Sequence, residues 1–140
     1  MRPSSATSEV ILNSQTHSGL NSDPITVTGD KVKGDGYYGW GDGVHTVEIE
    51  LTVFVGNIAL EATLATDPTE DDWFRVPLTA DSYYIDTSGA LVKLSSPSAI
   101  EYTAPTTSVK IYNFTGNFVW IRAVVDNWTA GSINRVLFNH

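Results

Sequence analysis

The side chains best suited to acid–base or metal chemistry are a run of carboxylates and three histidines. The carboxylates gather at residues 67–72, in the segment Asp-Pro-Thr-Glu-Asp-Asp. Such a run could hydrolyse a glycosidic bond only if a partner carboxylate faced it across a cleft, and the sequence does not place one there. The histidines, His17, His45 and His140, lie far apart without metal-ligand spacing. We therefore expect no enzyme active site and no zinc site.

Calcium is the metal that the acidic segments could hold. Asp35 and Asp42 lie in a glycine-rich stretch, and Asp67 begins the carboxylate run. Carboxylates on loops are ligands that Ca²⁺ prefers, although the chain has no match to the twelve-residue calcium loop. The carboxylate run also has an ordinary explanation, because Asp67, Pro68 and Glu70 match the first positions of a short capped helix. We expect no cofactor and regard the three aspartates as weak calcium candidates.

Aromatic residues in loops are a stronger sign of binding. Residues 34–43 have the sequence Gly-Asp-Gly-Tyr-Tyr-Gly-Trp-Gly-Asp-Gly, and glycine at that density predicts a loop with tight turns. Flat rings on loops can stack on sugars or anchor a protein interface. Trp73, Phe74 and Trp128 could instead close the ends of the core. The candidate interface or binding residues are Tyr37, Tyr38, Trp40, Trp73, Phe74 and Trp128.

Strands are the elements that must position these residues. Over residues 45–53 apolar and polar side chains alternate, which puts every apolar side chain on one face of a strand. No long segment shows an apolar stripe with the helical period. Short strands and turn residues at regular spacing predict an all-β fold, an antiparallel β-sandwich similar to a jelly roll.

A four-residue pattern, Phe-x-Gly-Asn, occurs twice and is followed each time by an apolar run. The copies are residues 54–57 and 114–117. Gly-Asn between two alternating runs is typical of a two-residue hairpin loop, because strand twist favours a positive φ at the first turn position. We predict hairpin turns at Gly56-Asn57 and at Gly116-Asn117. Similar turns explain the repeat more simply than an internal duplication does.

The chain divides into an arm and one domain. Residues 1–28 are rich in Ser, Thr and Asn and contain two short apolar clusters, so we expect an extended N-terminal arm with one or two strand pieces. Residues 29–140 are long enough to form a single β-sandwich domain with its own core. Further expectations are a strand, turn and strand around Ser88-Gly89, an edge strand at 100–103, a turn at 129–132 and a final strand at 133–138.

Composition excludes several classes of function. The net charge is −8 and the eight Lys and Arg residues are scattered, so we expect no direct binding to nucleic acid or to an anionic membrane. The absence of cysteine excludes disulfides and thiolate sites. The first residues lack the apolar region of a secretion signal, which favours folding in a cytoplasm.

Two long stretches, residues 36–76 and 111–139, contain five distinctive motifs. The motifs are Asp-Gly-Val-His-Thr-Val, Phe-x-Gly-Asn, Pro-Thr-x-x-Asp-Trp-Phe, Trp-Ile-Arg-Ala and Trp-Thr-x-Gly-x-Ile-Asn. In these motifs the chain resembles small virion structural proteins of tailed bacteriophages, especially contractile-tailed phages of marine cyanobacteria. The resemblance implies a place in a virus particle made in a bacterial cytoplasm. It transfers no catalytic residues.

The residues and the resemblance together predict a non-enzymatic virion structural protein, present in several copies or as a homo-oligomer. Its partners would be other virion proteins, either at the capsid, as a decoration unit, or at the neck, tail or baseplate. The alternative is a carbohydrate-binding module that recognises host surface glycans. In that case Tyr37, Trp40 and Trp73 would be the stacking platforms.

Overall fold

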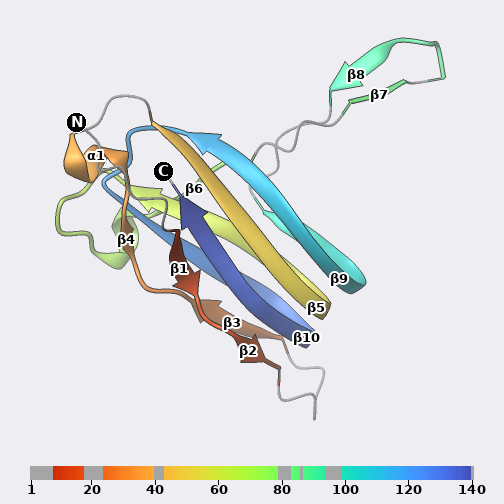
Figure 1. The fold of residues 1–140 in the computed structure, drawn as a ribbon, viewed down its shortest axis with the longest axis horizontal. Helices are drawn as coiled ribbons and strands as arrows, with labels where there is room; N and C mark the ends of the chain where they lie inside the picture. Colours follow the sequence, from red (N-terminus) through yellow and green to blue (C-terminus); the bar gives the residue numbers. More distant parts are fainter. Residues whose placement is uncertain are drawn as a thin grey trace.

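The computed structural model describes residues 8–17, 24–39, 43–78, 83–85, 87–93 and 99–139. These residues form an almost entirely β fold (Figure 1). Eight strands make one open antiparallel sheet, and two further strands make a separate hairpin. The predicted antiparallel β class is confirmed. The strand pairings, however, define one continuous sheet and do not divide it into the two sheets of a sandwich.

Three long strands form the centre of the sheet: β5 (Val44–Thr63), β9 (Ile100–Thr115) and β10 (Trp120–Asn139). β5 lies between the other two and pairs with both of them in antiparallel register (Figure 1). The first half of β5 confirms the predicted alternation as far as Leu51, because Val47, Ile49 and Leu51 are buried and the two glutamates between them are not. Val53, predicted on the same face, is instead 50% exposed.

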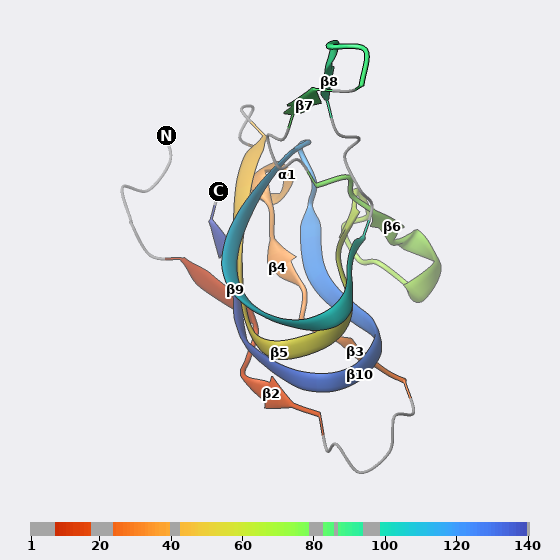
Figure 2. The same ribbon diagram turned by 90° about the vertical axis from the view of Figure 1, so that its right-hand side faces the viewer.

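Both β5 and β10 bend sharply near their middles, so that the two halves of the sheet curve toward one another (Figure 2). Shifts in the register of pairing mark the bends. At the bends, Val53 has a φ of 50° and Asn127 a φ of 47°. A β-branched residue such as Val53 rarely adopts a positive φ. The shifts in register are β-bulges, which increase the local bending of a strand. The bends bring apolar residues from both halves of the sheet into one core.

The predicted hairpin turns are wrong. Gly56 and Asn57 lie inside β5, where Asn57 is opposite Asp126 of β10. Gly116 and Asn117 follow β9 directly, but the chain then crosses to β10, which is separated from β9 by β5. The turn predicted at residues 129–132 is likewise a bulged part of β10. At residues 56–57 and 129–132, a bulge continues the strand pairing where a turn would end it.

Four short strands near the N-terminus pair with β10 along the edge that β5 leaves open. They are β1 (Glu9–Leu12), β2 (Gln15–Thr16), β3 (Ile25–Thr28) and β4 (Val32–Lys33). The strand pieces expected in residues 1–28 are therefore part of the sheet. Ile11 and Leu12 are buried in the core, so this segment contributes to folding as well as to any docking.

Short elements complete the fold. One helical turn, α1 (Asp35–Tyr38), occupies the segment that was predicted to be only loop. β6 (Phe74–Arg75) pairs with β5, while β7 (Tyr83–Ile85) and β8 (Leu91–Lys93) form the predicted hairpin around Gly89. No helix in the described ranges is long and apolar enough to cross a membrane.

The capped helical turn predicted from Asp67 begins two residues later. It is a 3₁₀ helix (Glu70–Asp72) whose N-cap is Thr69. The backbone N–H of Thr69 donates to Oδ2 of Asp72 at 2.7 Å, which is the reciprocal contact of a capping box. The carboxylate of Asp72 therefore has a structural role.

Candidate binding surfaces

The predicted aromatic candidates separate into different places in the fold. Trp128 is only 1% exposed and packs against Phe54 at the bend, with ring centroids 6.0 Å apart. Its indole N–H donates to the backbone oxygen of Ala130 at 2.9 Å. Trp128 is therefore a core residue, and its prediction as an exposed binding residue is wrong. Trp40 and Asp42 lie outside the described residues.

Tyr37 and Tyr38 lie on α1 at the surface and are 43% and 42% exposed. Their ring centroids are 5.5 Å apart, and the ring of Tyr37 lies 5.1 Å from that of Trp120 at the start of β10. Trp120 is held in place because its indole N–H donates to the backbone oxygen of Thr66 at 3.0 Å. Trp120 was not predicted to be a binding residue, because one Trp among apolar residues of a strand is typical of a core position.

Close backbone contacts fix α1 against the link between β9 and β10. The backbone N–H groups of Gly34 and Gly36 donate to the backbone oxygens of Val119 and Phe118, at 3.0 and 2.8 Å. A Cβ atom at Gly36 would collide with the backbone oxygen of Asn117. Glycine is thus required there by close approach, and it sets the position of the two tyrosines that follow.

Two lysines lie over these rings. The Nζ atom of Lys31 is 4.8 Å from the centre of the Trp120 ring, and that of Lys33 is 4.6 Å from the centre of the Tyr37 ring. An ammonium group at such a distance is attracted to the electron-rich face of the ring. Together with Glu9, Val10 and Tyr38, the two lysines and Trp120 line a surface groove of about 420 Å³, here called the cation–aromatic groove.

Trp73 lies in a second cluster that is closed by an arginine. The guanidinium of Arg122 stacks 4.2 Å from the Trp73 ring and donates to Glu61 at 2.9 Å and to Glu70 at 3.1 Å. Hydrogen bonds and the positive charge of Arg122 lower the pKa of Glu70. Burial opposes the charge of Arg122, but its hydrogen bonds with both glutamates outweigh this effect and raise its pKa. One face of the Trp73 ring is thus covered by the guanidinium of Arg122.

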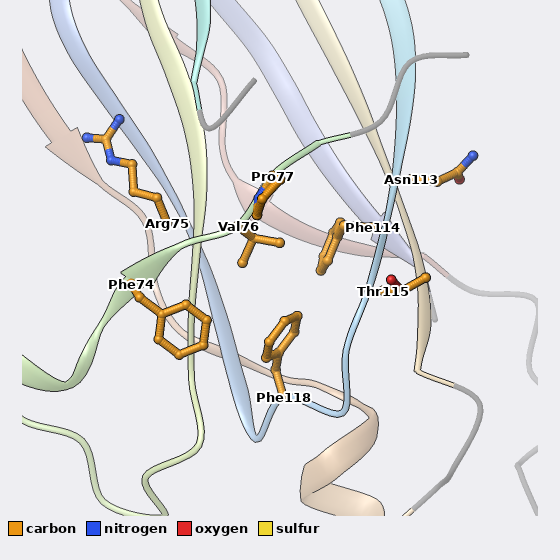
Figure 3. A pocket seen from close by; sticks show the side chains of 8 residues that line it. All are labelled: Phe74, Arg75, Val76, Pro77, Asn113, Phe114, Thr115 and Phe118. Carbon is orange, nitrogen blue, oxygen red and sulfur yellow. The ribbon is translucent and has the colours of Figure 1, made fainter. Parts of the chain in front are cut away.

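Phe74 lines an apolar pocket of about 460 Å³ (Figure 3). Its ring meets that of Phe118 edge to face at 5.6 Å, and Phe114 faces the same space from β9. The other lining residues are Arg75, Val76, Pro77, Asn113 and Thr115. Among the described residues, no carboxylate or histidine lines this pocket, so these residues offer mainly apolar contact.

The remaining calcium candidates do not form a site. Asp35 is fully buried, and its carboxylate lies 3.9 Å from Nε2 of His45, whose ring stacks on Phe114 at 4.8 Å. Asp67 is exposed on a separate loop. In the part of the chain that the structure describes, no three His, Asp or Glu side chains gather so that they could hold a metal ion.

The edge of the sheet at β9 is a further exposed feature. β9 pairs with β5 along one side, and no described strand pairs with its other side. Val109 and Ile111 point away from the core and are 63% and 62% exposed. A long open edge with apolar side chains is a template on which another strand can pair.

Comparison of the chain with protein-family models, with curated proteins and with solved structures finds no match. The proposals below therefore depend on the geometry of the chain and on the motifs in its sequence.

Proposed function

We propose that this protein is a non-enzymatic structural component of a bacteriophage particle that docks on neighbouring virion proteins through the β9 edge. The open edge of β9 is the observation that carries the proposal. The sequence motifs shared with virion structural proteins supply the biological setting.

The β9 edge has the features of a docking strand. It is 16 residues long, and its outward N–H and C=O groups face no described strand. A partner strand could add to this edge by main-chain hydrogen bonds, while Val109 and Ile111 would bury apolar surface against the partner. Burial of apolar area supplies about 25 cal/mol per Å², so even a short added strand would contribute substantially to docking.

The same strand contains features that limit indiscriminate pairing. Pro105 has no N–H group to donate, and Lys110 places a charge within the exposed segment. Proline and lysine at edges are common protections against aggregation. The stretch after Pro105, residues 106–115, is thus the longest uninterrupted surface for one chosen partner.

Repetition in a particle would convert such modest contacts into stable attachment, because each copy that docks holds its neighbours at high effective concentration. The protein would be made in the bacterial cytoplasm and act in the virion, as a decoration unit on the capsid or a fitting at the neck, tail or baseplate. Quantitative mass spectrometry of purified particles separates these positions. A copy number near that of the major capsid protein indicates decoration, and a small fraction of it indicates the tail assembly.

We also propose that the curved sheet acts as a β-sandwich similar to a jelly roll. The bends in β5 and β10 turn one half of the sheet toward the other (Figure 2). A single sheet curved in this way would give the two apposed faces that a sandwich has.

The docking role is tested with two matched substitutions, Ile111→Lys on β9 and Ile85→Lys on β7. The two isoleucines are 62% and 63% exposed, so loss of apolar surface in the free protein is equal. In phage lacking the gene and supplied with each variant, Ile111→Lys should greatly reduce incorporation into particles, while Ile85→Lys should not. Equal incorporation of both variants, with both folded by circular dichroism, would show that β9 is not the docking edge.

A further inference from the structure

We infer that the cation–aromatic groove binds an acidic oligosaccharide, one whose sugar rings bear carboxylate groups. This function is separate from docking through β9, because the groove lies beside β10 at the opposite edge of the sheet (Figure 1). The groove volume of about 420 Å³ falls within the range of about 300–1,000 Å³ that is usual for small-ligand sites.

The two lysines at the groove differ from the three described arginines in their partners. Arg75, Arg122 and Arg135 each form an ion pair with a carboxylate. Lys31 and Lys33, in contrast, form no ion pair with any carboxylate among the described residues and lie over aromatic rings. Their ammonium groups can therefore donate to an anionic ligand without breaking an existing pair. In a chain of net charge −8, two such cations at one groove make it the natural place for an acidic group.

The aromatic side chains give the groove an affinity for sugar rings. Tyr38 and Trp120 line it, and Tyr37 supports Trp120 from the side at 5.1 Å. The apolar face of a pyranose packs on flat rings of this kind, as apolar groups generally do on aromatic residues. Val10 adds an aliphatic contact from the facing strand β1.

Glu9 favours a sugar over a nucleic acid. Glu9 is one of the residues that line the groove, and a carboxylate can accept hydrogen bonds from sugar hydroxyls. The backbone of single-stranded DNA, in contrast, offers this carboxylate no hydroxyl groups. Single-stranded nucleic acid also stacks on aromatic residues, but it requires a positive track along its backbone, which two lysines beside one glutamate do not supply. The combination of cations, ring faces and one carboxylate therefore fits an acidic oligosaccharide.

Isothermal titration calorimetry on the whole chain tests the inference with three probes: a tetramer of galacturonate, the neutral galactose tetramer of the same linkage, and a short single-stranded oligothymidylate. The wild type should bind the galacturonate tetramer about tenfold more tightly than the neutral tetramer. It should bind the oligothymidylate more weakly than the galacturonate tetramer. Undetectable binding of the galacturonate tetramer, equal binding of the neutral tetramer, or tighter binding of the oligothymidylate would each overturn the proposal.

Three variants locate the site. The double substitution Lys31→Gln/Lys33→Gln should weaken binding of the galacturonate tetramer about tenfold or more. Tyr38→Ala should weaken the binding of both tetramers. Lys110→Gln, which removes an exposed lysine from the other edge of the sheet, should leave both affinities unchanged. Thermal melting of each variant checks that the fold is intact. An equal loss in Lys110→Gln and in the double variant would mean that binding follows overall charge and that the groove is not the site.

Discussion

The two Phe-x-Gly-Asn segments share a sequence pattern and have different structures. Residues 54–57 lie within β5 at its bend, whereas residues 114–117 span the end of β9 and the start of the link that follows it. In both copies the Phe is buried, and the Gly has a φ that other residues rarely adopt, +157° in Gly56 and +148° in Gly116. The Phe-x-Gly-Asn pattern thus places a buried Phe ring beside a point where the backbone changes direction. The neighbouring strands decide whether the chain continues in the sheet or leaves it.

The apolar runs that follow the two segments are partners in the sheet. Residues 58–63 of β5 lie opposite residues 120–125 of β10, and Glu61 faces Arg122 across the pair. The two side chains form an ion pair of 2.8 Å. Two strands that enter the same core side by side need the same alternation, which is a physical reason for the repeat that requires no duplication.

The largest expected effect is that of removing either buried ring. Phe54→Ala and Phe114→Ala should each lower the free energy of unfolding by about 3–5 kcal/mol. The loss should be larger for Phe54, because it is enclosed by Trp128 and Tyr102, while Phe114 borders the open pocket (Figure 3). Urea unfolding followed by fluorescence measures both values. A larger loss for Phe114→Ala would show that the bend is not the tighter of the two sites.

The second comparison concerns the glycines. A Cβ atom at Gly56 would lie 2.9 Å from Cα of Trp128, in the paired strand, so Gly56→Ala should cost about 1–3 kcal/mol. At Gly116 the Cβ atom would meet the ring of Phe118, a side chain that borders the open pocket and has room to move. Gly116→Ala should therefore cost less than Gly56→Ala. Chemical unfolding of the two variants measures the difference, and equal costs would contradict the distinction between bend and strand end.

Much of the fold could be predicted from local pattern. The alternation in residues 45–51 and the turn near Gly89 follow from local sequence, whereas the edge strand predicted at 100–103 is only the start of β9, which continues through Pro105 to Thr115. The continuous β5 and β10 could not be predicted, because Gly56-Asn57 is compatible with either a turn or a bulge. The choice depends on residues 120–139, whose pairing with β5 continues past the bulge. Such long-range pairing is not visible in a short segment.

The sequence predicted that the candidate site would be aromatic, but it predicted only some of the residues that form the site. Tyr37 and Tyr38 were identified because glycine-rich loops expose the aromatic residues they contain. Trp120 and Lys33 were missed because they come together only through the pairing of β4 with β10, where they are direct partners. Trp128 was wrongly predicted to be an exposed binding residue, because its burial depends on a bend that the local sequence does not predict.

The smallest expected effect on stability at neutral pH is that of Tyr102, and it is specific to the first segment. Tyr102 lies opposite Gly56, and its ring meets that of Phe54 edge to face at 5.7 Å. Burial raises the pKa of Tyr102, and the nearby Tyr112 adds to this effect. The folded protein therefore holds this proton more strongly than the unfolded chain does, for which the tyrosine pKa is about 10. Its contribution to stability is complete below that pH and is lost as the pH rises further.

Thermal melting of wild type and Tyr102→Phe between neutral and strongly alkaline pH measures this contribution. The wild type should lose stability above pH of about 10, and Tyr102→Phe should lose less, because it has no phenol to ionise beside the bend. In the second segment Phe114 stacks on His45 and not on a tyrosine. Phe114→Ala should therefore lose as much stability at alkaline pH as the wild type does. Parallel alkaline curves for wild type and Tyr102→Phe would show that the two segments do not differ in this respect, and that other tyrosines govern the loss.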